Sequence, residues 1–217
     1  MTLRTGLFDL DGTLTDPELG ITNCIAFALR ELGAPVPPQA ELRGWIGAPL
    51  QATFADFLGS DSLSEDALAL YRSRFTDTGL FENTPYAGIH ETLAALRPTF
   101  ESFLVVTSKP TVFARRIIEH FDLDRFFDEV YGSELDGRFT NKVDLMGHVI
   151  ETRQLQPPSA VMVGDRRFDV QAARQHGVRA VGVLWGFGDR EELETAGADA
   201  ICKTVTDLPA TIAGLAD

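Results

Sequence analysis

Short apolar segments alternate with helical patterns along most of this chain, and this alternation restricts the fold more than any other feature. Apolar runs bounded by turn signals lie at 3–10, 103–107, 161–163 and 178–184, with a weaker one at 200–202. Each has the length of a strand that is buried on both faces. Helical periodicity is found at 110–121, 142–154, 168–176 and 190–196. This order predicts an α/β fold, with a Rossmann-like parallel sheet core covered by helices on both faces.

The segment that follows the first predicted strand has a different pattern. Strand signals vanish and several helical patterns follow one another. The first is expected to have Asp16 as its N-cap and to stop at Gly33, and a later one opens with a capping box that begins at Ser62. These patterns predict a small all-helical cap domain inserted after the first strand. The predicted domains are the cap, 15–83, and the core, 1–14 with 84–217.

The composition limits the partners of the protein. Of its 217 residues, 44% are hydrophobic, which is enough for a substantial core. The formal net charge of -13 argues against nucleic acid and anionic membranes as partners. Cys24 and Cys202 fit no disulfide framework or metal-binding spacing, which indicates a reducing, cytoplasmic setting. The sequence predicts no membrane span or signal peptide, and it leaves the oligomeric state open, a homodimer included.

Two pairs of aspartates follow two of the predicted strands. Asp9 and Asp11 lie in FDLDGT, and residues two apart on a strand share a face, so both side chains can point into one crevice. Asp165 and Asp169 lie in VMVGDRRFD, about one helical turn apart. Taken singly, the first pair also fits an ordinary Asp-Gly turn and the second an acidic helix start.

Taken together, the two pairs indicate a metal site. Up to four carboxylates at neighbouring strand ends would repel one another strongly unless a divalent cation lay among them. The ligands would all be oxygen atoms, with no His or Cys cluster, and this set favours Mg²⁺ over zinc.

Two further segments supply groups that bind phosphate. FLVVTSKP places Thr107 and Ser108 just before a predicted helix, where hydroxyl and amide groups can contact an anion; an ordinary N-cap is the alternative. Lys142 begins another predicted helix, where its charge opposes the helix dipole and needs a compensating reason. A solvated surface lysine is the alternative there.

The segments DLDGT, VVTS, Lys142 and GDRRFD occur in the order and spacing of the haloacid dehalogenase-like (HAD) phosphatases, and the resemblance covers essentially the whole chain. The helical insert resembles the cap of that family. Within it, the chain looks most like the phosphoglycolate phosphatase-like branch, including its bacterial 5'-nucleotidase-like members. The segments IGAPL, ENTPYAGI, YGSELDG and GDRRFD support that placement.

The resemblance implies a reaction and a cofactor. It implies a Mg²⁺-dependent phosphomonoesterase that acts on a small phosphorylated metabolite through an aspartyl-phosphate. Asp9 would be the nucleophile, and Asp11 would be the general acid and base. Mg²⁺ would bind the Asp9 carboxylate, the Asp11 backbone carbonyl and Asp165, with Asp169 holding the water ligands of the metal.

The resemblance also assigns the groups that bind phosphate. Thr107 and Lys142 would contact the transferring phosphoryl oxygens, helped by the amides of Gly12 and Ser108. Ser108 stands where many relatives carry Asn, and two arginines follow Asp165 where Ser is frequent. Neither departure removes a catalytic group, and both bear on substrate preference.

Three other residues bear on the site, and two of them have two interpretations each. Lys109 either contacts substrate or is a surface lysine at a helix start. Arg43, in the predicted cap, either contacts an anion or belongs to a solvated face. Trp185 follows a predicted strand and is expected simply to pack near the end of the sheet.

Two other functions stay open. One is a phosphosugar mutase of the same fold, in which a bisphosphorylated intermediate is retained and reoriented. The other is a non-catalytic binding protein that keeps the fold. The intact set of Asp9, Asp11, Lys142 and Asp165 argues against the second.

Overall fold

The computed structural model describes residues 2–215, and the chain divides into two compact units. The sheet unit consists of the residues up to Thr15 and those from Pro85 onward, and the helical unit is Asp16–Thr84. The connections between them are β2 (Thr15–Asp16) and β3 (Thr84–Pro85), which pair as a two-stranded sheet. These boundaries lie one residue after the predicted ones. No helix within residues 2–215 is long and apolar enough to cross a membrane.

The sheet unit is built on six strands in the order β5-β4-β1-β6-β7-β8, all paired in parallel. Parallel pairing brings the carboxyl ends of all six strands to one edge, where ligands of open α/β sheets bind. The strands are β1 (Thr5–Phe8), β4 (Ser102–Pro110), β5 (Glu129–Ser133), β6 (Ala160–Gly164), β7 (Arg179–Val183) and β8 (Ala200–Cys202).

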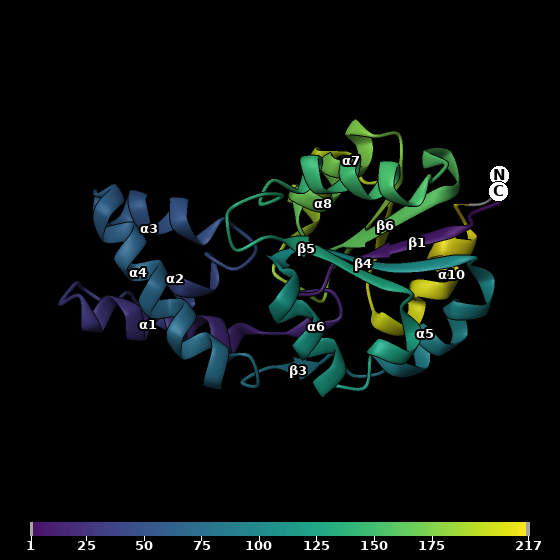
Figure 1. Ribbon diagram of the computed structural model, residues 1–217. Helices are drawn as coiled ribbons and strands as arrows, with labels where there is room; N and C mark the ends of the chain where they lie inside the picture. Colours follow the sequence, from purple (N-terminus) through teal and green to yellow (C-terminus); the bar gives the residue numbers. More distant parts are fainter. Residues whose placement is uncertain (1, 216–217) are drawn as a thin grey trace. The chain divides into compact units, whose positions relative to one another are not determined.

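Helices cover both faces of this sheet, so the predicted fold class is confirmed. In Figure 1, α7 and α8 lie over one face, and α5 and α10 lie over the other. The central strands carry apolar side chains on both faces. Adjacent residues of a strand point to opposite faces, so Leu7 packs in the cluster formed with α7 and α8, while the Phe8 ring lies 4.6 Å from that of Phe103. The helices are α5 (Ile89–Leu96), α6 (Thr111–His120), α7 (Lys142–Arg153), α8 (Arg167–Gln175), α9 (Arg190–Ala196) and α10 (Leu208–Ala213).

Two elements of the sheet unit differ from the predictions. The edge strand β5 was not predicted, because its sequence EVYGS mixes charged, aromatic and glycine residues and only Val130 is aliphatic. β4 extends beyond the predicted end at Thr107 as far as Pro110, which pairs with Ser133 after an irregularity in the register. The following helix α6 therefore begins at Thr111 and not at Pro110.

The helical unit contains four α-helices and a π-helical turn among its described residues. They are α1 (Glu18–Glu31), α2 (Gln39–Arg43), α3 (Leu50–Leu58), α4 (Asp61–Arg74) and the π-helical η1 (Phe75–Gly79). Two predicted caps are shifted. The N-cap of α1 is Pro17, although the Asp16 carboxylate does accept the Glu18 amide at 3.0 Å. The N-cap of α4 is Ser60, whose hydroxyl accepts the Leu63 amide, and the predicted capping box at Ser62 does not form the start.

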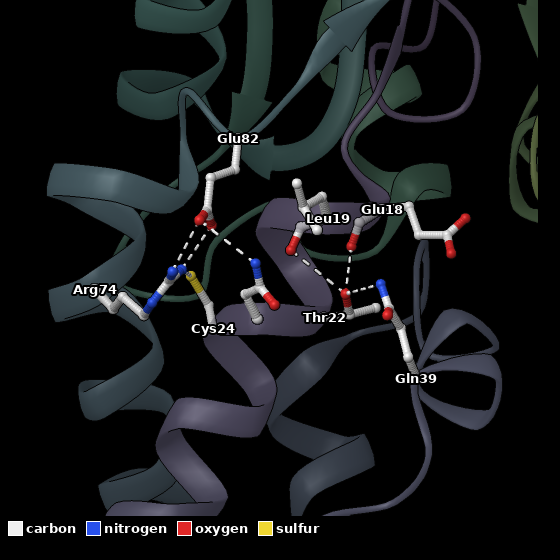
Figure 2. A network of polar contacts seen from close by, with 8 residues as sticks. Glu18, Leu19, Thr22, Cys24, Gln39, Arg74 and Glu82 are labelled. Carbon is white, nitrogen blue, oxygen red and sulfur yellow. Dashed lines mark hydrogen bonds and ion pairs between the residues drawn. The ribbon is translucent and has the colours of Figure 1, made fainter.

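A partly buried polar network links three segments of the helical unit (Figure 2). Arg74 donates to both carboxylate oxygens of Glu82, at 2.8 and 3.0 Å, and also to the Cys24 sulfur at 3.0 Å. The Asn23 amide reaches the same carboxylate at 3.4 Å, and the Gly20 amide donates to the Glu82 carbonyl. The network therefore fixes the end of α4 and the segment before β3 to α1.

Candidate active site

The carboxyl end of β1 carries the first two predicted aspartates. Asp9 continues the strand, since its amide donates to the Val163 carbonyl of β6 at 2.9 Å. The chain then turns at Gly12, whose φ is +81°. A Cβ at Gly12 would lie 2.2 Å from an oxygen of the Asp165 carboxylate, so only glycine allows both this φ and this approach. Asp9 is buried and Asp11 is partly buried at the end of this turn.

The end of the neighbouring strand β6 carries the second pair. Asp165 follows β6 directly, and Asp169 lies in the first turn of α8, where its carboxylate accepts the Arg166 amide at 3.0 Å. Because β6 pairs with β1, the two strand ends are adjacent. Asp9, Asp165 and Asp169 each offer a carboxylate oxygen, and these atoms all lie within 4.8 Å of one another. The structure thus brings together three of the four predicted side chains.

Lys142 supplies a buried positive charge to this cluster. It is the first residue of α7, and Asn141 caps the helix by accepting the Val143 amide. The Lys142 Nζ lies 2.9 Å from Asp9 Oδ1 and also forms an ion pair with Asp169. Burial lowers the pKa of Lys142, but the Asp169 and Asp9 charges outweigh that effect and the net pKa is raised. These ion pairs are the compensating reason for a cation at a helix start.

A second buried ion pair lies beside the first. Lys109, on β4, places its Nζ 2.7 Å from Asp11 Oδ2, and both side chains are largely screened from water. Lys109 is only 9% exposed, so the surface interpretation of this residue is wrong. Burial raises the pKa of Asp11, whereas the charge and hydrogen bond of Lys109 lower it. Burial is the larger effect, so the net pKa of Asp11 lies above its usual value although Lys109 opposes the rise.

Within residues 2–215, the hydrogen-bond donors that reach Asp165 are neutral. The Phe187 amide donates to its Oδ2 at 2.8 Å, and the Thr13 hydroxyl lies 3.5 Å from its Oδ1. It is fully buried and forms no ion pair within that range. Burial raises the pKa of Asp165 well above its usual value, and the charges of Asp169 and Asp9 raise it further. Burial also raises the pKa of Asp169 to about 6, against the effect of Lys142.

The site therefore contains more negative than positive charge. Four carboxylates, Asp9, Asp11, Asp165 and Asp169, face two lysines. A divalent cation would offset this excess of negative charge, and it would lower the pKa values of the carboxylates that burial raises. The three-carboxylate cluster offers oxygen atoms alone, which is the ligand type that Mg²⁺ prefers. The residues present thus fit Mg²⁺.

Comparison with known proteins agrees with this geometry. A family model described as haloacid dehalogenase-like hydrolase matches residues 7–183. The chain belongs to this family. The 5'-nucleotidase of Pseudomonas aeruginosa is 44% identical to it over 203 residues, which cover 93% of this chain and 92% of that protein. The tyrosine-protein kinase PtkA of Mycobacterium tuberculosis is 35% identical over 200 residues, which cover 92% of this chain and 68% of the kinase.

A solved structure extends the likeness to the fold. A protein of Clostridium acetobutylicum described as a predicted phosphatase is 37% identical, with a TM-score of 0.94, and the match covers 99% of this chain and 100% of that one. The prediction of an enzyme of the HAD family is therefore confirmed. The fold and the family explain why the four motifs meet at one edge of the sheet.

The residues of this HAD hydrolase that were predicted to bind phosphate form hydrogen bonds within the protein. Thr107 is buried on β4, and its hydroxyl accepts the Lys109 amide at 3.3 Å. The Ser108 carbonyl accepts the Ser133 hydroxyl at 2.8 Å. The Gly12 amide donates to the Thr15 carbonyl at 2.8 Å, so a bond from Gly12 to phosphate would require this bond to be released. Their roles in phosphate binding stay predictions.

Arg43 belongs to the helical unit and is described within it. Its Nε lies 2.9 Å from Glu18 Oε2, and its side chain is 49% exposed. The structure therefore places it next to the first residue of α1, close along the chain to β2. The predicted contact with a substrate anion stays a prediction.

The loop between β7 and α9 was missed as part of the site. Trp185 was expected only to pack near the sheet, yet its indole Nε1 donates to the Thr13 carbonyl at 3.0 Å, and the Phe187 amide reaches Asp165. A signal was available, because WGFG places two glycines directly after a strand, at the edge where the aspartates lie.

Proposed function

We propose that the protein is a Mg²⁺-dependent phosphomonoesterase that forms an aspartyl-phosphate on Asp9. The observation that carries this proposal is the buried cluster in which Asp9, Asp165 and Asp169 offer oxygens within 4.8 Å while Lys142 pairs with Asp9. A nucleophilic carboxylate, an oxygen-ligand metal site and a fixed cation are the parts that phosphoryl transfer needs. Membership of the HAD hydrolase family supports the same reaction.

Mg²⁺ would be held by the carboxylates of Asp9 and Asp165 and by the backbone carbonyl of Asp11. Asp169 would orient its water ligands, because the carboxylate is fixed at the start of α8 by the Arg166 amide. When bound, the metal supplies charge neutralisation to the phosphoryl oxygens. This assignment also accounts for a fully buried Asp165 that lacks an ion pair within residues 2–215.

Asp9 and Asp11 would divide the chemistry between them. An Asp9 oxygen attacks phosphorus in line, the bond from phosphorus to the ester oxygen breaks, and Asp11 donates its proton to the departing alkoxide. Asp11 then accepts a proton from a water molecule that attacks the aspartyl-phosphate, which releases phosphate and restores Asp9. Lys142 offsets the repulsion between Asp9 and the incoming anion. Lys109 stabilises the ionised Asp11 that the second step requires.

We would test nucleoside monophosphates as substrates first and phosphoglycolate next. The relative at 44% identity is a 5'-nucleotidase, and the sequence resembles the phosphoglycolate phosphatase-like branch. Thr107, Ser108 and Gly12 would contact the transferring phosphoryl group. The helical unit would act as a cap that selects the rest of the substrate and excludes water, with Arg43 as its anion contact.

A phosphate-release assay over a panel of phosphorylated metabolites tests the proposal. We expect release that requires Mg²⁺, stops in excess chelator and falls sharply in Asp165→Asn. The PtkA relative makes transfer to an acceptor other than water a second outcome to measure, with ATP as donor and a tyrosine peptide as acceptor. A coupled isomerisation assay covers the phosphosugar mutase. Transfer or isomerisation without phosphate release would replace the phosphatase proposal.

A further inference from the structure

The loop of residues 185–188, WGFG, contacts two catalytic segments at once. Its Trp185 side chain donates to the Thr13 carbonyl, in the turn after Asp11, at 3.0 Å. Its Phe187 amide donates to Asp165 Oδ2 at 2.8 Å. One bond therefore reaches the end of β1 and the other reaches the end of β6, although the loop itself follows β7.

The glycines of this loop lie where no side chain fits. A Cβ at Gly186 would meet the Gly12 carbonyl at 2.3 Å and Asp165 Oδ2 at 2.4 Å. A Cβ at Gly188 would meet the Asp165 carbonyl at 2.0 Å. The backbone of Gly186 is thus packed directly between the turn that follows Asp9 and the buried carboxylate of Asp165. The φ of Gly186 lies outside the left-handed region, so close approach and not backbone conformation explains the glycine.

We infer that the 185–188 loop is a positioning element for the metal site, with Gly186 setting the spacing between the β1 turn and Asp165. The inference rests on the proposed function, because it concerns the residue assigned to Mg²⁺. Asp165 has no ion pair within residues 2–215 to fix its orientation, and the shorter of its two hydrogen bonds within that range, at 2.8 Å, comes from this loop. Loss of a group that orients a metal ligand in this way typically weakens metal affinity about 10- to 100-fold.

A merely structural loop would give a different result from a positioning loop. If the loop only packed against the sheet, changes in it would lower the melting temperature and leave metal binding alone. If it sets the orientation of Asp165, changes in it weaken Mg²⁺ binding in the absence of any substrate. The dissociation constant for Mg²⁺, measured by isothermal titration calorimetry on the metal-free full chain, separates the two.

Gly186→Ala is the sharpest variant. The new methyl group needs no change of backbone region but displaces Asp165 or the Gly12 turn, and we expect Mg²⁺ affinity to fall about 10- to 100-fold. Gly214→Ala is the matched control in the same unit, since its Cβ would meet only ordinary contacts at 3.6 Å. We expect the control to bind Mg²⁺ as the wild type does.

Trp185→Phe is a second, milder variant that keeps an aromatic ring and removes the indole donor. Loss of one hydrogen bond predicts roughly a 2- to 10-fold weaker Mg²⁺ affinity, with phosphatase activity at limiting Mg²⁺ restored by raising its concentration. This variant decides the question if Gly186→Ala does not fold.

Wild-type affinity in both folded loop variants would overturn the inference and leave the proposed function intact. A wild-type protein that binds no Mg²⁺ would overturn both. A fall in affinity in the loop variants, with Gly214→Ala unchanged, supports the loop as the positioning element.

Discussion

Each of the two units of this protein has a cluster of charged groups that is at least partly shielded from water, and the clusters differ in their balance of charge. In the helical unit, Arg74 pairs with Glu82, and Asn23 and Cys24 complete the network (Figure 2). Hydrogen bonds from Arg74 lower the pKa of Glu82, against the effect of its partial burial. In the sheet unit, burial raises the pKa of Asp165 and Asp169, and the positive charge of Lys142 is too small to offset this rise.

This difference separates a structural network from a functional one. In a balanced ion pair each charge has a partner of opposite sign, and the pair fixes the helices that carry it. An unbalanced cluster is unfavourable in the folded protein and has a reason to exist only if it binds something of opposite charge. The excess of carboxylates at the ends of β1 and β6 is therefore stronger evidence for function than the presence of charged residues as such.

The largest effect is expected from the nucleophile of the unbalanced cluster. Asp9→Asn should abolish phosphate release, because an amide is a poor nucleophile and a poorer ligand for Mg²⁺. Steady-state phosphate release measures it, with circular dichroism as the control for folding. Near-normal turnover would show that Asp9 is not the nucleophile.

Asp11→Asn should cost less, and the loss should depend on the leaving group. Removal of a positioned acid and base typically lowers the rate about 10²- to 10⁴-fold. An aryl phosphate needs little protonation of its leaving group, so its first step should be slowed less than that of an alkyl phosphate. Single-turnover rates for the two substrate types measure this. Equal losses for both would contradict the assignment of Asp11 as the acid.

Metal binding should correct the charge imbalance in a pH-dependent manner. The folded-state pKa of Asp169 is about 6 against a usual value of 3.8, so its contribution to metal-free stability is present below pH 3.8 and is lost as pH rises through about 6. Mg²⁺ should relieve this loss. We expect the Mg²⁺-induced rise in melting temperature to be larger at about pH 7.5 than at about pH 5. The opposite order would contradict the imbalance.

The smallest effect is expected from the balanced network. Arg74→Ala should lower the free energy of unfolding by about 1 kcal/mol, or roughly 2 to 4 °C in melting temperature, because the ion pair is only partly buried. Mg²⁺ affinity should not change. Arg190→Ala, which breaks the exposed pair with Glu194, is the control with an even smaller effect. Loss of Mg²⁺ affinity in Arg74→Ala would break the comparison between the two clusters.

The sequence predicted the parts of this protein that depend on local pattern. Strands buried on both faces give continuous apolar runs, so β1, β6, β7 and β8 were found, and α9 was placed at its observed bounds. The strand β5 was missed because it lies at the edge of the sheet and pairs with β4 alone. An edge strand need not be uniformly apolar, and its sequence therefore lacks the continuous apolar run. The helix starts are shifted by one or two residues: α1 begins after Pro17, and the Ser60 hydroxyl caps α4 in place of Ser62.

The part of the candidate site that could be predicted is the part whose motifs lie at strand ends. Asp9, Asp165, Asp169 and Lys142 meet because parallel strands bring their carboxyl ends to one edge. The pairing of Lys109 with Asp11 and the contact of the 185–188 loop with Asp165 depend on side-chain directions and loop paths across three strands. The glycines of WGFG indicate that this loop approaches other groups closely, but spacing along the chain does not show which groups meet in either contact.

The most direct test of the account is to trap the covalent intermediate. Asp11→Asn protein, mixed with an aryl phosphate and Mg²⁺ and quenched in acid, should carry one phosphoryl group on the peptide that contains Asp9, as mass spectrometry of the digested protein would show. The same experiment in excess chelator should leave that peptide unmodified. A phosphoryl group on a different residue, or turnover of the substrate with no modified peptide at any time, would contradict the aspartyl-phosphate on Asp9.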